Sequence, residues 1–304
     1  PHTVKTYANC FVLLVQFAAD RLKRRPTDLE VEDLGTDMIM AFLDHVEIGR
    51  GSCVRTRNGR LAAIRSFFRY IEYRIPACLD QALRVRAIPT KKTDKALIDY
   101  LDRAEIKALL DTPDPRTRLG TRDRAMLHLT YAGGLRVSEL VTLQLGDFPD
   151  RSLSTMHIMG KGRRERVLPL WKETQIALRA WLAIRPQVEV TEIFLNANGQ
   201  PMTRDGFAFR LAEHVKTAAT KQPSILGKRV TPHVLRHSCA MHTLAATGDI
   251  RKVALWLGHA SIQSTETYLR ADPEEKLQIL AAHGAPAIKP GRFKPPSDAL
   301  ITML

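Results

Sequence analysis

Six side chains in the second half of the chain are of the types needed to attack a phosphodiester without a metal. In chain order they are Arg136 in GGLRVSEL, Lys161 in GKGRRER, His233 and Arg236 in HVLRH, His259 in LGHA, and Tyr268. Cations neutralise a phosphate and the charge that builds on it in the transition state. A tyrosine can act as the nucleophile and carry the phosphate covalently. No single motif indicates this chemistry, but the six in this order would rarely recur by chance.

Arg136 follows a double glycine and stands at the predicted start of a helix. Helix N-termini attract phosphate, and an arginine there can bind it through two hydrogen bonds. Glu139 lies three residues further along the helix, within reach as a partner that fixes the arginine. Alone, such a pair is more often an ordinary surface salt bridge, so this interpretation depends on the other motifs.

The segment VTPHVLRH has the pattern of a helix start. Thr231 is a good N-cap and Pro232 suits the first helical position. His233 and Arg236 then lie one turn apart on one face, where each can hold a phosphate oxygen. His237 is adjacent, but neighbouring helical residues point about 100° apart. We therefore do not assign His237 to the site.

The remaining three residues are each expected at a turn or on a short helix. Residues 153–170 alternate around Gly-Lys-Gly, which predicts a β-hairpin with Lys161 at its tip. The GxxxxGK[ST] frame of a P-loop is missing there. Gly248–Gly258 has the pattern of a capped helix, so His259 lies at the turn that follows it. Tyr268 is expected on a further helix, where a lone tyrosine usually has a packing role.

The first 74 residues show helical periodicity. We expect helices over about Tyr7–Ala19, Thr36–Val46 and Cys53–Tyr73. The third has an arginine-rich face, whereas a solvated face normally mixes both signs of charge. We therefore interpret it as a surface that follows DNA phosphates, with contacts from Arg55, Arg57, Arg60, Arg65 and Arg69.

The chain is expected to divide into two domains and a tail. Two prolines and several cations over 75–97 predict a linker. The second domain opens with Asp102–Glu105, which has the spacing of a capping box. Prolines and glycines over 284–298 predict an extended conformation for the C-terminal tail, 284–304, whose last residues are apolar again. The resulting domains are 1–88, 98–283 and the tail.

Composition indicates a polyanionic partner. The formal net charge is +14 and the isoelectric point is about 9.9, which favours nucleic acid. No apolar run approaches the ~20 residues that a membrane span needs, so no membrane association is expected. The four cysteines are far apart and match no metal-site spacing. Free thiols in a reducing cytoplasm are the expected state.

These motifs together resemble those of the tyrosine recombinase (phage-type integrase) family, most closely its compact Xer-type members, over nearly the whole chain. The resemblance implies a mainly α fold with a small β-sheet. A helical core-binding (SAM-like) domain over 1–88 and a mixed α/β catalytic domain over 98–283 would clamp DNA. Every catalytic position of the family has its match, in Arg136, Lys161, His233, Arg236, His259 and Tyr268.

The resemblance also implies a mechanism. Tyr268 would attack the scissile phosphate, form a 3′-phosphotyrosyl link and release a 5′-hydroxyl. The 5′-hydroxyl of a partner strand would then reverse the step, so neither ATP nor a metal cofactor is needed. By the same resemblance, Arg136 and Arg236 would hold the non-bridging oxygens, and Lys161 would protonate the leaving 5′-oxygen. His233 would assist proton transfer, and His259 would donate a hydrogen bond to the phosphate.

Double-stranded DNA and further recombinase subunits are the partners that the resemblance implies. The working assembly would be a homo- or hetero-tetramer on two recombination sites, with Leu277, Ile279 and Leu280 able to dock on a neighbouring subunit. A mobile element (integration, excision or transposition) and Xer-like dimer resolution both fit this chemistry. The alternatives are a type IB topoisomerase, which relaxes one duplex, and a non-catalytic DNA-binding protein.

Overall fold

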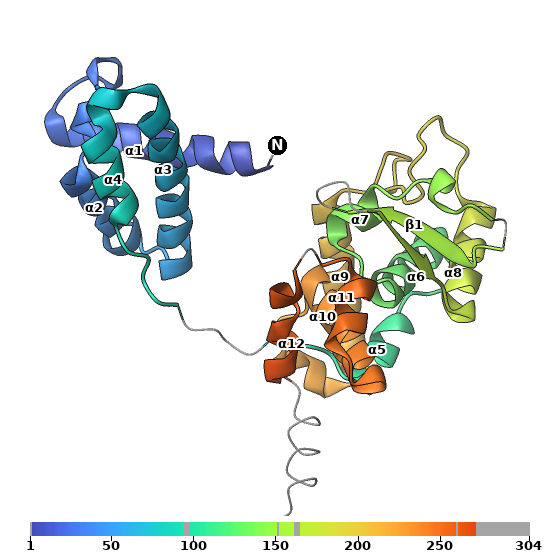
Figure 1. Ribbon diagram of the computed structural model, residues 1–304. Coiled ribbons are helices and arrows are strands. Elements are labelled where there is room, and N and C mark those ends of the chain that lie inside the picture. The colour runs from blue at the N-terminus through green and yellow to red at the C-terminus, as the bar shows by residue number, and fades with distance from the viewer. Residues whose placement is uncertain (1, 94–97, 151, 161–164, 260, 272–304) are drawn as a thin grey trace, which may run out of the picture. The chain divides into compact units, whose positions relative to one another are not determined.

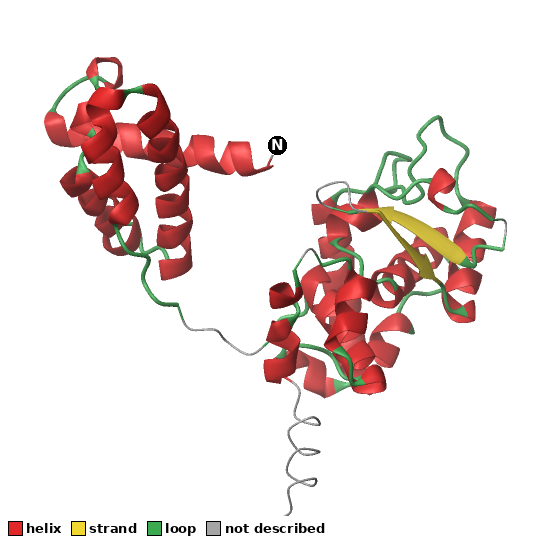
Figure 2. Cartoon of the chain, viewed as in Figure 1, coloured by secondary structure: helices red, strands yellow, loops and turns green. Residues whose placement is uncertain are grey.

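Helices dominate the chain in the computed structural model, and the strands of the described residues form one two-stranded sheet (Figure 2). The described residues are 2–93, 98–150, 152–160, 165–259 and 261–271. The chain forms two compact units, Pro1–Ala96 and Leu97–Leu304. The mainly α fold with a small β-sheet is thereby confirmed. The expected tail over 284–304 lies outside the described residues.

The first unit is a bundle of helices around one apolar core (Figure 1). Its helices are α1 (His2–Leu22), α2 (Thr36–Asp44), α3 (Val54–Arg74) and α4 (Leu79–Ala87). Each helix contributes to the core, for example through Leu14, Phe42, Phe68 and Val85, which are all buried. Burying apolar side chains of this size is what stabilises a small helical unit.

Helix α4 corrects the prediction of a linker over 75–97. Pro76 begins a short 3-10 turn, Pro76–Cys78, and α4 follows directly. Ala82 and Val85 of this helix are fully buried. The prediction was wrong because a proline is tolerated in the first turn of a helix, where its missing N–H would have no partner. Pro89 comes only after α4 has ended.

The arginines of α3 do not form the single exposed face that we expected. Arg57 is only 2% exposed, and its Nε lies 3.4 Å from Oε2 of Glu47. Its place on the helix directs it toward the turn after α2, where this carboxylate offers a counter-charge. Arg60 and Arg65 are half-buried. The members of the expected set that stay exposed are Arg55 and Arg69.

The second unit holds the six candidate catalytic residues. Its elements are α5 (Arg103–Leu110), α6 (Arg118–Ala132), α7 (Val137–Val141), β1 (Thr155–Met159), β2 (Glu165–Pro169), α8 (Lys172–Ile184), α9 (Arg204–Lys221), α10 (Pro232–Thr247), α11 (Ile250–Leu257) and α12 (Glu266–Ala271). One large apolar core joins the elements from α5 to α10, and a smaller cluster joins α10, α11 and α12.

Local caps fix where the helices that carry the site begin and end. Asp102 and Glu105 form the predicted capping box at the start of α5. The Thr231 side chain accepts a hydrogen bond from the Val234 amide at the start of α10, as its sequence predicted. At the end of α11, Gly258 has φ of +64°, a left-handed conformation that favours glycine. The predicted α11, with His259 directly after it, is confirmed.

The hairpin of β1 and β2 is antiparallel, with His157 opposite Val167. Met156, Ile158 and Leu168 point into the large core, as period-two alternation requires. Lys161, expected at the tip of this hairpin, lies outside the described residues. The structure therefore shows the two strands that carry its loop but not the lysine itself.

Candidate active site

Arg236 is the central side chain of the site. It lies on α10, is only 4% exposed, and donates hydrogen bonds to the carbonyl oxygens of Gly134 and Leu257. It thereby ties the turn before α7 to the end of α11. Gly134 has φ of +53°, and a Cβ there would lie 2.5 Å from Cδ2 of Leu257. This close approach requires a glycine, which explains the double glycine before Arg136.

Glu139 collects three guanidinium groups around one buried carboxylate. Arg136 is the N-cap residue of α7, and its Nη1 lies 2.7 Å from Oε1 of Glu139. Arg166, on β2, donates to both carboxylate oxygens at 3.3 and 2.9 Å. Nη1 of Arg236 lies 3.9 Å from Oε2. Burial alone would raise the pKa of Glu139, but the hydrogen bonds from Arg166 and Arg136 hold it below its ordinary value.

This cluster has more positive charge than its carboxylate can balance. Three guanidinium groups against one carboxylate leave a surplus of two positive charges. Burial, followed by the repulsion from Arg136, lowers the pKa of Arg236 to about 10, so it stays charged at neutral pH. Charges held away from water need a counter-ion. The Arg136 side chain is 30% exposed, so an anion can reach the cluster from its side.

Tyr268 lies beside this cluster but is not open to solvent. It belongs to α12, is 2% exposed, and packs against a cluster that includes Cys239 and Leu257. Its hydroxyl lies 3.0 Å from Nδ1 of His237. Burial raises the pKa of Tyr268 to about 12, although nearby Arg236 acts in the opposite direction. The tyrosine is therefore protonated in this state.

His259 lies against the tyrosine from the turn after α11. Its ring is nearly parallel to that of Tyr268, with centroids 6.4 Å apart and planes at 12°. Its Nδ1 lies 2.8 Å from Oγ1 of Thr265. Burial and then Arg236 lower the pKa of His259 to about 4, so the ring is neutral at pH 7. A neutral ring with Nδ1 engaged can present Nε2 to a phosphate oxygen as a donor.

The structure brings most of the sequence-predicted residues together. Arg136 and Arg236 meet at Glu139, and His259 stacks on Tyr268. His233 is exposed, and its ring stacks on His237 with centroids 6.5 Å apart. Lys161 cannot be placed, because it falls outside the described residues.

Two residues of the site were missed from the sequence. Arg166 could have been found, because period-two alternation puts it on the same inward face as Leu168. His237 was set aside because it points away from Arg236 along α10. The helical phase describes directions around α10 alone, whereas Tyr268 reaches the His237 ring from α12. No pattern in the sequence indicates this approach.

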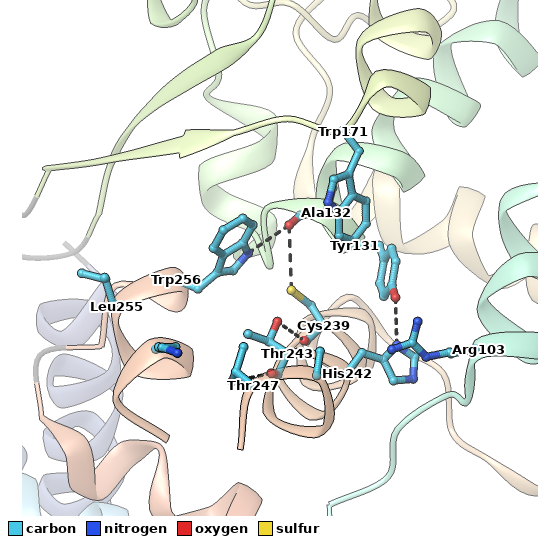
Figure 3. A pocket seen from close by; sticks show the side chains of 12 residues that line it. Arg103, Tyr131, Ala132, Trp171, Cys239, His242, Thr243, Thr247, Leu255 and Trp256 are labelled. Carbon is cyan, nitrogen blue, oxygen red and sulfur yellow. Dashed lines mark hydrogen bonds between the residues drawn. The ribbon is translucent and has the colours of Figure 1, made fainter. Parts of the chain in front are cut away.

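A pocket of about 490 Å³ lies on α10 and α11, lined mainly by apolar side chains (Figure 3). Nε1 of Trp256 donates to the Ala132 carbonyl at 3.0 Å, and Cys239 lies close to the same oxygen. Tyr131 and His242 form a second tyrosine–histidine pair, joined at 2.8 Å (Figure 3). His242 lies on α10 like His237, whereas Tyr131 lies on α6, and their hydrogen bond involves none of the three arginines around Glu139.

The described residues contain neither a metal-binding cluster nor a membrane-spanning helix. No cluster of three or more His, Cys, Asp or Glu residues there is arranged to hold a metal ion. Within the same residues, no helix combines the length and the apolar composition that a bilayer span requires.

The fold and the site thus define a helical, phosphate-directed enzyme with a tyrosine beside clustered arginines. The Phage integrase family model matches residues 99–275. A Sinorhizobium fredii protein named as an integrase/recombinase is 40% identical over 300 residues, covering 99% of this chain and 90% of its own length. Tyrosine recombinase XerC of Myxococcus xanthus is 34% identical over 287 residues, covering 92% and 90%. The chain therefore belongs to the phage integrase family of tyrosine recombinases.

A solved structure supports the same fold. The XerH site-specific recombinase, in a post-cleavage complex with its palindromic difH substrate, superposes with a TM-score of 0.68 and 20% identity. The match covers 91% of this chain and 78% of that one. The family, the fold and the enzyme class expected from the sequence are confirmed, and tyrosine recombinase is supported over a topoisomerase or a non-catalytic DNA-binding protein.

Proposed function

We propose that this protein is a site-specific recombinase that cuts and rejoins double-stranded DNA through a 3′-phosphotyrosyl link to Tyr268. The observation that carries this proposal is the surplus of two positive charges around Glu139, next to a buried tyrosine. A phosphodiester supplies the missing negative charge, and the cluster stabilises the further charge of the transition state. The net charge of +14 favours the same polyanion.

The proposed residue roles combine the family resemblance with the positions of the described groups. Arg136 and Arg236 hold the non-bridging oxygens. Arg166 donates to both carboxylate oxygens of Glu139 and balances its negative charge, which would otherwise repel the phosphate. His259 donates to the phosphate from its ring beside Tyr268. His233 assists proton transfer, and Lys161 protonates the leaving 5′-oxygen. The first unit adds phosphate contacts from the exposed Arg55 and Arg69.

The nucleophile must change its surroundings before it can react. Tyr268 is 2% exposed and its pKa is about 12, so it is a protonated and covered phenol. We propose that bound DNA shifts the short α12 and brings the hydroxyl to the phosphate held by the arginines. An enzyme of this kind cuts only where a duplex has been engaged.

The working assembly is proposed to be a tetramer on two recombination sites. Leu277, Ile279 and Leu280, which lie outside the described residues, are proposed to dock on a neighbouring subunit. We favour movement of a mobile element over dimer resolution as the biological role. A cytoplasmic location is proposed as well, supported by the free thiols of Cys10, Cys53, Cys78 and Cys239.

Trapping covalent complexes on a pool of DNA fragments tests the function. The protein is incubated with the pool, the mixture is denatured, and the DNA that stays attached to protein is sequenced. We expect one recurring cleavage site with protein on the 3′ end and a free 5′-hydroxyl. Attachment to the 5′ end, or attachment at unrelated sequences, would contradict a site-specific recombinase.

A further inference from the structure

His237 contacts the reacting atom of the nucleophile. Its Nδ1 lies 3.0 Å from the hydroxyl oxygen of Tyr268, and the two rings are at 61° with centroids 5.7 Å apart. It is one residue from Arg236, which anchors the cation cluster. The family match identified from the sequence gives His237 no role. Its position nonetheless puts an imidazole nitrogen within hydrogen-bond distance of the hydroxyl that would attack the phosphate.

The protonation states of both groups allow the Tyr268 hydroxyl to donate this hydrogen bond to Nδ1 of His237. Burial, then the repulsion from His233 and Arg236, lowers the pKa of His237 to about 4. The pKa of Tyr268 is about 12. At neutral pH the ring is therefore neutral and the phenol is protonated. In the tautomer with the proton on Nε2, the hydroxyl donates and Nδ1 accepts, which is the geometry that a general base requires.

Among the described residues, four charged or titratable groups face the His237 ring. His233 and Arg236 face it from α10, Tyr268 from α12, and His259 from the turn after α11. Arg236 is among the groups that keep a proton off the ring, and a bound phosphodiester would offset that charge. DNA binding therefore makes His237 a better proton acceptor at the step where the tyrosine must lose its proton.

Resting on the proposed function, we propose that His237 is a catalytic residue that receives the phenolic proton of Tyr268 as the tyrosine attacks DNA. In the cleavage step, the bond from the Tyr268 oxygen to phosphorus forms and the bond from phosphorus to the 5′-oxygen breaks. The phenolic proton moves to Nδ1 of His237, and the 5′-oxygen takes a proton from Lys161. Rejoining reverses both transfers, so the leaving phenolate recovers its proton from His237.

The proton moves with the attack and not before it. A phenol with a pKa near 12 does not give its proton to a ring with a pKa near 4 in the DNA-free protein. As the oxygen bonds to phosphorus, it becomes far more acidic, and the ring is already in place to accept. A purely structural role for His237 would need only the hydrogen bond, not the proton transfer.

Single-turnover cleavage separates these two roles. The substrate is a nicked suicide duplex that carries the site mapped from trapped complexes. The key variants are His237→Ala, which removes the acceptor, and His237→Asn, whose amide oxygen can still accept the hydrogen bond but cannot take a proton. His242→Asn is the matched control, because His242 holds the Tyr131 hydroxyl at 2.8 Å from the same helix.

We expect both His237 variants to form the covalent adduct about a hundredfold more slowly or worse, with the dissociation constant for the duplex unchanged. The His242 variant should cleave at the wild-type rate. A 5′-bridging sulfur should not rescue either His237 variant, because their defect lies at the nucleophile. Between pH 7 and 10, His237→Ala should gain about tenfold per pH unit, as hydroxide replaces the missing base.

Two results would overturn the inference. Wild-type cleavage by His237→Asn would show that only the hydrogen bond matters. Faster cleavage by His237→Ala would show that the contact restrains the tyrosine. Failure of the proposed function looks different, because the wild-type protein would then form no adduct on any duplex. Should the alanine variant unfold, the asparagine variant alone decides between the two roles.

Discussion

Replacing Glu139 with glutamine should destabilise the second unit by leaving buried guanidinium groups without a counter-charge. The carboxylate accepts from the Arg136 amide at 2.9 Å, from Nη1 of Arg136, and from both terminal nitrogens of Arg166. Glutamine has nearly the same size, but it offers one acceptor and turns an amide group toward cations. The change therefore removes charge without leaving a cavity.

The loss in the free energy of unfolding depends on which arginine is left buried without a counter-charge. Breaking a buried ion pair costs about 3–5 kcal/mol. The Arg136 side chain is 30% exposed and can turn toward water, and Arg236 keeps its two carbonyl acceptors. Arg166 is only 9% exposed and keeps one hydrogen bond at most, to a neutral amide oxygen in place of a carboxylate. We therefore expect the lower end, about 3 kcal/mol, which lowers the unfolding temperature of a unit this large by about 6–12 °C.

Thermal unfolding followed by calorimetry measures this effect, with Glu213→Gln as the control. Glu213 pairs with Lys216 at 2.7 Å on the surface of α9, where an ion pair is worth little. With chloride as the reference salt, inorganic sulfate should raise the unfolding temperature of Glu139→Gln more than that of wild type, because an added divalent anion replaces the lost carboxylate. An equal increase in both proteins would show that the cluster binds no anion.

Acid provides a second check on the same carboxylate. The folded-state pKa of Glu139 is depressed below its ordinary value of 4.5. The contribution of the Glu139 carboxylate to folding stability is therefore complete above pH 4.5 and disappears as the pH falls through the folded-state pKa. The difference between wild type and Glu139→Gln should shrink in strong acid. If Glu139→Gln lowered the unfolding temperature at neutral pH as little as Glu213→Gln does, Glu139 would not be needed to balance buried positive charge.

Three further predictions concern DNA, the leaving group and pH. Neutralising Arg55 and Arg69 should weaken binding to all duplexes and reduce the salt slope by about one unit per lost contact; a loss confined to one base position would instead indicate base reading. Lys161→Ala should cleave normal DNA slowly and recover with a 5′-bridging sulfur, whereas Arg136→Ala should not; equal rescue of both would refute the assigned roles. Folding stability should fall as the pH drops from about 6.5 toward 4, because His237 and His259 bind protons in the unfolded chain but not in the folded protein, where both are half-buried; a flat pH profile of the unfolding temperature would contradict this.

Local signals predicted the elements of the site well. The capping residues Asp102, Thr231 and Asp249 begin the helices that the sequence indicated, and Gly258 ends α11. Caps depend on neighbours within a few residues, so the sequence contains the whole signal. The same holds for the hairpin strands, whose alternation alone identifies their buried face.

Contacts between distant segments could not be predicted in the same way. Arg57 is buried because Glu47 lies opposite it on another element, and helical phase along α3 does not reveal that. His237 meets Tyr268 because α12 packs on α10, thirty-one residues further along the chain. Pro76 was read as a break because its effect depends on whether a helix follows it.

Measuring the covalent protein–DNA adduct tests most directly whether Tyr268 is the nucleophile. Tyr268→Phe is compared with wild type on the nicked suicide duplex, with Tyr131→Phe as the control for losing a buried tyrosine hydroxyl. Adduct is measured by denaturing electrophoresis and binding by gel shift. Tyr268→Phe should bind the duplex normally and form no adduct, whereas Tyr131→Phe should form it like wild type. An adduct that persists in Tyr268→Phe would contradict the assignment of the nucleophile.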